Sequence, residues 1–399
     1  MASFSKRISY MRETADVVRV LFESVTDAGT ITFGAGAPAK EALPVDAVAE
    51  ITRELMADRA KGFQMLQYGN PGGLPALRQV VVDHLLLPRG LDAKYENTII
   101  ANGGMESVSM TGHLYLDPGD VVLVESPTFV QAIETFQIFQ AQCIAVETDD
   151  GGFVIDALED SIKKHNPKII YVIPTFQNPS GRTTTLERRK AIAELASRYD
   201  VIVVEDDPYC ELRYSGEALP SIKSFDKTGN VIYANSFSKV FSPGCRLGYV
   251  YADKEIIDRM YDVKTALNSM TNIFTQTICA EFFTRGLYPE HLKRICGIHK
   301  ERRDALMHSL KEHMPEGVRW VYPDGGLFSW VELPENLSTT ELLPEIMAAG
   351  ATYLPGKQFF APGQPILDNC MRMSFGQSTP EAIDKGVKLM VPVIKSKLL

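Results

Sequence analysis

The sequence predicts an α/β protein, in which a mostly parallel sheet is covered by helices and a smaller α+β domain lies beside it. The first observation is that apolar runs of strand length alternate with helical patterns between about residues 75 and 250. These runs are TIIA (98–101), VVLVE (121–125), IIYVI (169–173), VIVVE (201–205), VIYA (231–234) and LGYVY (247–251). The second observation is that the runs are apolar almost throughout, which indicates strands that are buried on both faces.

The third observation is a change of pattern after about residue 290. A long charged helical region is followed by VRWVYPDGGLFSWVEL (318–333), which predicts short strands around a Gly-Gly turn. The segment up to about residue 45 has no strand series of its own, so we expect it to pack with the C-terminal region. We therefore predict a large domain at 46–290 and a small domain formed by 1–45 and 291–399.

The helical pattern before VIVVE indicates how the sheet is covered. Four positions in it follow the i, i+3, i+4, i+7 spacing of an amphipathic helix, namely Ile192, Leu195, Ala196 and Tyr199. The basic clusters ERRK (187–190) and KERR (300–303) also sit in helical patterns and have acidic neighbours. We interpret both clusters as solvated helix faces.

The composition excludes several classes of function. The 399-residue chain has 41 Lys and Arg residues against 50 Asp and Glu residues, which opposes binding to nucleic acid or to an anionic membrane. No apolar stretch reaches the length of a membrane span, and the N-terminus lacks the apolar core of a signal peptide. The six cysteines lie singly along the chain, as free thiols in a reducing compartment do. We expect a cytoplasmic protein.

Polar and glycine-rich segments directly follow five of the predicted strands. They are NGGMES after TIIA, SPTF after VVLVE, PTFQNPSG after IIYVI, DDPYCELRY after VIVVE and NSFSK after VIYA. Ligands bind at the carboxyl edge of parallel strands, so these loops are expected to converge on one crevice. Lys239 would stand in that crevice, and its neighbours there would be Asp206, Tyr209 and Asn178.

This set of side chains matches what pyridoxal phosphate needs. A lysine amine forms the Schiff base, a buried carboxylate keeps the ring nitrogen protonated, and an aromatic ring such as Phe129 stacks on the cofactor ring. Ser236, Ser238 and Arg246 offer hydrogen-bond donors to the phosphate. The glycines of NGG (102–104) let backbone amides approach it closely.

Taken singly, each of these residues also has an ordinary interpretation. Lys239 could be a surface lysine, and Asp206 could be a turn or capping residue. Arg372 could pair with a surface carboxylate. The aromatic residues that could be ordinary core or interface side chains are Tyr68, Phe129 and Tyr209. No complete set of metal-ligand spacings occurs in the sequence, so we predict no metal site.

Five motifs carry a family resemblance, because they occur together and in this order. They are QYGNPGGLPALR (67–78), NPSG (178–181), VEDDPYCELRY (204–214), SFSKVFSPGCRLGY (236–249) and MRMSFG (371–376). Over nearly its whole length the chain resembles the fold-type I pyridoxal-phosphate aminotransferases of class I/II, nearest to the branch of 2-aminoadipate and kynurenine aminotransferases. The resemblance implies a seven-stranded sheet in the large domain and a homodimer with shared active sites.

The resemblance also implies a role for each site residue. Lys239 would be the Schiff-base lysine and the proton shuttle, and Asp206 would pair with the pyridine nitrogen. Tyr209 and Asn178 would hydrogen-bond the ring oxygen, and Phe129 would stack on the ring. The residues implied to hold the phosphate are Gly103, Gly104, Met105, Ser236, Ser238 and Arg246, with Tyr68 from the other subunit. The residues implied to bind the substrate are Arg372, Asn178, Gly36 and Arg19, of which Arg372 would clamp the α-carboxylate.

Two segments depart from the resembled pattern, and one residue has two interpretations. Many relatives have AGGLP where this chain has GAGAP (34–38), so Ala35 replaces a glycine beside the substrate. The loop NGGMES lacks the Ser/Thr-Gly-Ser-Gln pattern that is common in relatives. Arg19 could meet a side-chain carboxylate of the substrate, as an arginine at this place does in the resembled branch, or it could be a solvated helix residue.

The implied activity is a ping-pong exchange of an amino group between an L-amino acid and a 2-oxo acid. We expect glutamate and 2-oxoglutarate as one pair, and 2-aminoadipate, an aromatic or an aliphatic amino acid as the other donor. The sequence leaves the physiological donor open. One alternative is a lyase that uses the same cofactor for C–S or β-elimination. Another is the ligand-sensing module of a transcription regulator, although we expect no room for a DNA-binding domain in the fewer than 50 residues that precede the segment GAGAP (34–38).

Overall fold

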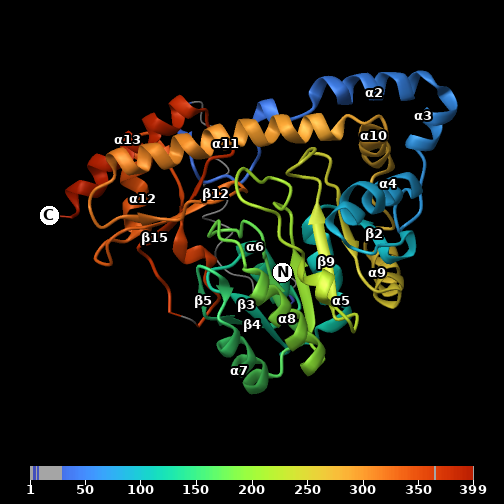
Figure 1. The fold of residues 1–399 in the computed structure, drawn as a ribbon, viewed down its shortest axis with the longest axis horizontal. Helices are drawn as coiled ribbons and strands as arrows, with labels where there is room; N and C mark the ends of the chain where they lie inside the picture. The colour runs from blue at the N-terminus through green and yellow to red at the C-terminus, as the bar shows by residue number, and fades with distance from the viewer. Residues whose placement is uncertain (1–2, 6, 9–28, 364, 399) are drawn as a thin grey trace.

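The computed structural model describes residues 3–5, 7–8, 29–363 and 365–398, and it contains the predicted α/β core (Figure 1). A seven-stranded sheet has the strand order β2-β10-β9-β8-β7-β3-β4. The strands are β2 (Thr98–Ala101), β3 (Val121–Glu125), β4 (Gln142–Val146), β7 (Ile169–Val172), β8 (Ile202–Asp206), β9 (Val231–Ser236) and β10 (Gly248–Tyr251). Within this sheet β10 alone runs antiparallel to its neighbours, so the other six strands point in one direction.

Helices cover both faces of this sheet. They are α4 (Pro75–Val80), α5 (Gly104–Tyr115), α6 (Val130–Ile138), α7 (Ile155–His165), α8 (Leu186–Tyr199), α9 (Lys254–Leu267) and α10 (Ile273–Thr284). On β3, Leu123 belongs to an apolar cluster with α7 and α8, whereas Val122 and Val124 belong to a different cluster. Successive strand residues point to opposite faces, so both faces are buried and the continuous apolar runs are explained.

A second region is built on an antiparallel sheet with the order β11-β12-β15-β14. Its elements are β11 (Arg319–Trp320), β12 (Phe328–Glu332), β14 (Leu354–Pro355), β15 (Cys370–Ser374), α12 (Thr339–Ala348) and α13 (Pro380–Ser396). The long helix α11 (Tyr288–His313) runs along the top of Figure 1 and packs against α13. The boundary predicted after residue 290 falls in the first turn of α11, and the division into two domains stays a prediction.

The described part of the N-terminal segment contacts the C-terminal region through one strand pair. Strand β1 (Ile31–Thr32) pairs in parallel with β13 (Ala351–Thr352). After it, α2 (Val45–Ala57) and α3 (Arg59–Met65) form an arm at the upper right of Figure 1. The short elements are η2 (Lys40–Ala42), η3 (Val81–Leu86), η4 (Leu87–Arg89), η5 (Tyr95–Asn97), β5 (Thr148–Asp149), β6 (Gly152–Phe153), η6 (Ile222–Phe225) and η7 (Gly356–Phe359).

The helices of the described residues include none that is both long and apolar enough to cross a membrane. The interpretation of the two basic clusters as solvated faces is wrong for three of their residues, since Arg189, Arg302 and Arg303 are buried. The Arg189 guanidinium donates to the carbonyl oxygens of Pro174 at 2.7 Å and Thr184 at 2.9 Å. A guanidinium has five N–H donors, so backbone carbonyls can satisfy it inside the protein.

Candidate active site

The predicted crevice exists at the carboxyl edge of the large sheet. A cavity of about 410 Å³ opens there, and residues of the antiparallel sheet close its other side. The predicted residues that line it are Gly36, Phe129, Asn178, Tyr209, Lys239, Arg246 and Arg372. The other lining residues are Gly34, Ala35, Ala37, Val130, Gln131, Pro243, Phe328 and Leu354. Strands that point in one direction place their following loops at a common edge, which is why residues so far apart in sequence meet here.

Lys239 reaches this cavity from the loop that follows β9. Its Nζ donates a hydrogen bond to the carbonyl oxygen of Gly36 at 2.8 Å and lies 5.8 Å from the centre of the Tyr209 ring. Desolvation lowers the pKa of Lys239 from 10.5 to about 8, and the charges of Arg372 and Arg246 add to this effect. A larger fraction of the amine is therefore uncharged near neutral pH, as a nucleophilic lysine requires.

Asp206 is the last residue of β8 and is buried, with 4% of its surface exposed. The hydroxyl of Tyr171 donates a hydrogen bond of 2.6 Å to its Oδ2 atom. Burial raises the pKa of Asp206 to about 7, and the neighbouring Asp207 raises it further against the effect of Tyr171. A carboxylate that is desolvated to this extent fits a cationic partner, such as a protonated ring nitrogen.

The sequence analysis missed Tyr171, because it lies inside the apolar run IIYVI. Tyr171 is fully buried, and its side-chain hydroxyl is hydrogen-bonded to Asp206. Its place in the sequence could have pointed to it. Tyr171 lies one residue before the carboxyl end of β7, and β7 is the strand paired with β8, which ends at Asp206. A buried tyrosine hydroxyl needs a partner, and the adjacent strand end is the nearest place to find one.

An anion cradle lies beside Asp206. The Oγ atoms of Ser236 and Ser238 are 2.9 Å apart, and Gly104 at the start of α5 lies against Ser236 and Asp206. Gly103 has a φ of 77°, and a Cβ added to it would lie 2.4 Å from Nη2 of Arg246. Hydroxyls, a guanidinium and the N-terminus of a twelve-residue helix together suit a phosphate group.

This cradle is held from behind by a buried ion pair that the sequence analysis missed. The carboxylate of Glu106 accepts a hydrogen bond of 2.6 Å from Nζ of Lys264, a side chain with no exposed surface. The same carboxylate accepts 2.5 Å and 3.1 Å hydrogen bonds from the backbone and side chain of Asn102, and Asn268 also donates to it. Glu106 thus fastens the segment NGGMES to α9.

Arg372 lies on β15 and is 6% exposed. Its Nη1 donates to Oδ1 of Asn178 at 2.8 Å, and its Nη2 donates to the carbonyl oxygen of Gly34 at 2.5 Å. Its guanidinium lies 4.3 Å from the centre of the Phe328 ring, and its Nε atom has no hydrogen-bond partner among the described residues. Burial lowers the pKa of Arg372 to about 10. A buried cation whose partners are neutral favours a carboxylate ligand.

Met105 and Tyr68 are predicted residues that are not among those that line the cavity. Met105 packs against the large apolar core in the first turn of α5. Tyr68 is 83% exposed and does not line the cavity of its own chain. Arg19 lies outside the described residues. The structure therefore assembles the residues predicted around a cofactor ring and a carboxylate, while the partner-subunit role of Tyr68 stays a prediction.

The residues present fit pyridoxal phosphate at each of its parts. Lys239 offers an amine, Asp206 offers a buried carboxylate, and the Ser236–Ser238 cradle offers donors to an anion. Gly103 leaves open the space that a Cβ would fill beside Arg246. The fold and this site define a fold-type I enzyme that depends on pyridoxal phosphate.

Comparisons with known proteins agree with this class. The family model "Aminotransferase class I and II" matches residues 28–389, and the chain belongs to this family. It is 36% identical to aromatic-amino-acid aminotransferase 1 of Thermococcus litoralis, over 99% of this chain and 94% of that protein. It is 32% identical to the 2-aminoadipate transaminase of Thermus thermophilus, over 97% and 96% of the two chains. A kynurenine aminotransferase structure from Pyrococcus horikoshii superimposes with a TM-score of 0.93 at 36% identity, over 99% of this chain and 98% of that one.

We predict that Lys264→Met lowers the free energy of unfolding by about 3–5 kcal/mol, because it leaves the Glu106 carboxylate buried without a cation. Urea unfolding of the holoenzyme measures this loss. The double variant Glu106→Gln with Lys264→Met is the control, and it should recover most of the lost stability because no charge remains. A cost below about 1 kcal/mol for Lys264→Met alone would show that the pair does not support the loop.

Proposed function

We propose that this pyridoxal-phosphate-dependent aminotransferase takes its amino group from an L-amino acid with an aromatic or aliphatic side chain, and that glutamate and 2-oxoglutarate form the second pair. The observation that carries the proposal is that Lys239 and Arg372 line one cavity, while the buried Asp206 is close enough to Lys239 for the two charges to interact. When bound, the cofactor supplies an electron sink that stabilises negative charge on the substrate Cα.

We propose the following roles for the residues of this chain. Lys239 holds the cofactor covalently and carries the proton that leaves the substrate Cα, because its amine is desolvated and its pKa is lowered. Asp206 keeps the ring nitrogen protonated, while Asn178 and Tyr209 hydrogen-bond the ring oxygen and Phe129 covers one ring face. The residues proposed to hold the phosphate are Gly103, Gly104, Met105, Ser236, Ser238 and Arg246, with Tyr68 from the second subunit.

Arg372 is proposed to bind the substrate α-carboxylate with help from Asn178, and Gly36 forms the wall beside it. Leu354 lies opposite Arg372 in the register of β14 and β15, so both side chains stand on one face of that sheet. Val130 also lines the cavity and belongs to the same apolar cluster as Leu354. A substrate held by Arg372 therefore meets apolar surface next to the arginine, which supports a donor with an apolar side chain.

The cations that line the described cavity are Lys239, Arg246 and Arg372, and each already has a proposed role. Binding of a second carboxylate, as in glutamate or 2-aminoadipate, is therefore proposed to depend on Arg19. The names of the similar proteins, which cite aromatic amino acids, 2-aminoadipate and kynurenine, support both kinds of donor.

We propose that the enzyme acts in the cytoplasm as a homodimer with shared active sites and with two domains per chain. Three large side chains that lie close together in sequence are exposed in and just after α3. Phe63, Leu66 and Tyr68 are 64%, 68% and 83% exposed. Apolar side chains gathered on one short segment are typical of a surface that another chain covers. A second copy of the chain is the proposed partner.

We predict that phenylalanine or leucine converts the bound cofactor of the wild-type holoenzyme to its amine form, with release of the matching 2-oxo acid. Absorbance spectroscopy follows the cofactor, and 2-oxoglutarate should restore the original spectrum. Lys239→Ala should slow the conversion more than about 10³-fold, because the covalent anchor and the base are both lost. Release of ammonia and pyruvate from donors with a β-leaving group, without any amine form of the cofactor, would instead establish the lyase alternative.

We also predict that two inactive variants complement each other. Lys239→Ala and Tyr68→Ala, when co-expressed, should give about a quarter of the wild-type activity, because half of the randomly formed dimers would hold one intact site. Activity assays of the purified mixture and of each variant alone measure this effect. Lack of any recovery, although the two chains associate, would contradict a shared site.

A further inference from the structure

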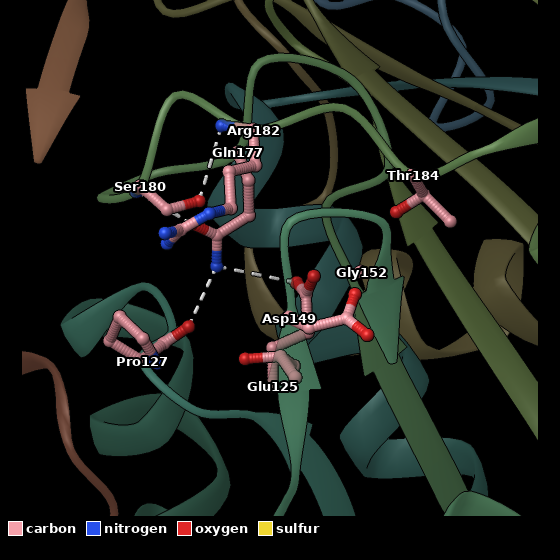
Figure 2. A pocket seen from close by; sticks show the side chains of 9 residues that line it. Glu125, Pro127, Asp149, Gly152, Gln177, Ser180, Arg182 and Thr184 are labelled. Carbon is pink, nitrogen blue, oxygen red and sulfur yellow. Dashed lines mark hydrogen bonds between the residues drawn. The ribbon is translucent and has the colours of Figure 1, made fainter. Parts of the chain in front are cut away.

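A small cavity lies behind the turn that carries Asn178, outside the cavity that holds the proposed cofactor site. Its volume is about 10 Å³, which is room for about one water molecule. The lining residues are Glu125, Pro127, Thr148, Asp149, Gly152, Gln177, Ser180, Arg182 and Thr184. Figure 2 shows the Gln177 side chain between Ser180 on one side and the Pro127 and Glu125 groups on the other.

Gln177 joins two loops through its side chain. Its Nε2 donates to the carbonyl oxygen of Pro127 at 2.8 Å, and its Oε1 accepts from the backbone N–H of Ser180 at 2.7 Å. Its backbone N–H and carbonyl also bond Arg182 and Gly181, at 2.8 Å and 2.7 Å. The side chain is 4% exposed, so these bonds are shielded from water.

Both joined loops form walls of the cofactor cavity. The loop of Pro127 leads to Phe129, which caps the start of α6 and lines the cavity. The turn of Gln177 contains Asn178, whose Oδ1 accepts the 2.8 Å hydrogen bond from Arg372. Gln177 therefore ties the loop that carries Phe129 to the turn that carries Asn178, the hydrogen-bond partner of Arg372.

Glu125 supports Gln177 from the end of β3. Its Oε2 accepts from the backbone N–H of Ile173 at 2.9 Å and from Nε2 of Gln177 at 3.5 Å, and it is 3% exposed. No ion pair is formed by Glu125 in the described part of the chain, and burial raises the pKa of its carboxyl to about 8. Near neutral pH the group is thus a neutral acid that holds Gln177 by hydrogen bonding.

We propose that Gln177, supported by Glu125, is a positioning residue that sets the affinity of the Asn178–Arg372 pair for the substrate carboxylate. The inference rests on the proposed role of Arg372. It adds a residue that touches neither cofactor nor substrate and acts through Asn178. A purely structural Gln177 would affect unfolding alone, so ligand affinity separates the two roles.

The test measures the dissociation constant of 3-phenylpropionate, a carboxylate that lacks an amino group, from the absorbance change of the bound cofactor in the holoenzyme. Gln177→Ala and Glu125→Leu should each raise this constant about 10- to 100-fold, because each releases the turn of Asn178 and so weakens its hydrogen bond to the charged Arg372. The kcat at saturating donor should fall less than about threefold, because the lost interaction serves ground-state and transition-state binding alike.

Two matched variants serve as controls. Arg182→Ala removes a side chain of the same turn that pairs with the exposed Asp150, and it should leave the dissociation constant within about twofold. Glu125→Gln keeps an acceptor for Ile173 and should also stay within about twofold at pH 7. Unchanged affinity in both Gln177→Ala and Glu125→Leu would overturn the proposal, whatever their melting temperatures. If the Arg372→Met variant binds 3-phenylpropionate as tightly as the wild type does, the proposed role of Arg372 as carboxylate clamp is itself wrong.

Stability against pH tests the neutral form of Glu125 and stays informative if Gln177→Ala fails to fold. The pKa of Glu125 is raised from 4.5 to about 8, so the folded state holds this proton more tightly than the unfolded state. The wild type therefore loses stability as pH rises through this window, whereas Glu125→Gln does not. The groups that face Glu125 are Tyr171, Asp149 and Arg182. The melting temperature of Glu125→Gln minus that of the wild type should increase between about pH 5 and pH 8, and a constant difference would show an ionised Glu125.

Discussion

Burial of ionisable groups at the carboxyl edge of one sheet is the constraint on which the rest of the site depends. Asp206 and Arg372 are each at least nine-tenths buried, and the protein offers them mainly neutral partners. The pKa of Asp206 rises and the pKa of Arg372 falls, because burial disfavours each charge more than its neighbours compensate it. Both shifts therefore describe the ligands by charge, a cation at Asp206 and an anion at Arg372. A pyridinium ring and an amino-acid carboxylate meet these two demands.

The side chains proposed to meet the ligand are themselves held by buried groups that do not line the cavity. Tyr171 donates a hydrogen bond to Asp206, the Glu106–Lys264 pair fastens the segment NGGMES, and Gln177 holds the turn of Asn178. Tyr171 comes from a neighbouring strand and Lys264 from a neighbouring helix, whereas Gln177 holds its own turn against the loop of Pro127. Rigid elements can hold a loop to within the tolerance that chemistry needs, whereas a loop alone cannot. This arrangement lets loops of variable sequence share one fold.

The sequence predicted the parts that depend on local pattern. The apolar runs predicted six of the seven strands, all but β4, and the polar residues after them predicted Lys239 and Asp206 within one site. Arg372 was assigned to that site only through the family resemblance. The supports were not predictable in this way, because Glu106 and Lys264 are 158 residues apart and meet only through the packing of α5 on α9. The burial of Arg189 was equally unpredictable, because a basic cluster on a helix is usually solvated. In the folded chain Arg189 is buried, and distant carbonyl oxygens accept its hydrogen bonds.

The proposed role of Asp206, whose buried carboxyl would keep the ring nitrogen of the cofactor protonated, can be tested directly. The ¹⁵N chemical shift of ring-labelled pyridoxal phosphate in the holoenzyme measures this proton directly. We expect a protonated ring nitrogen from about pH 6 to about pH 9 in the wild type. The negative charge of Asp206 and the positive charge of the pyridinium ring stabilise each other in a desolvated site. In Asp206→Asn the nitrogen should be unprotonated over the same range. An unprotonated nitrogen in the wild type, or the same ¹⁵N chemical shift in the wild type and Asp206→Asn, would contradict the proposed role of Asp206.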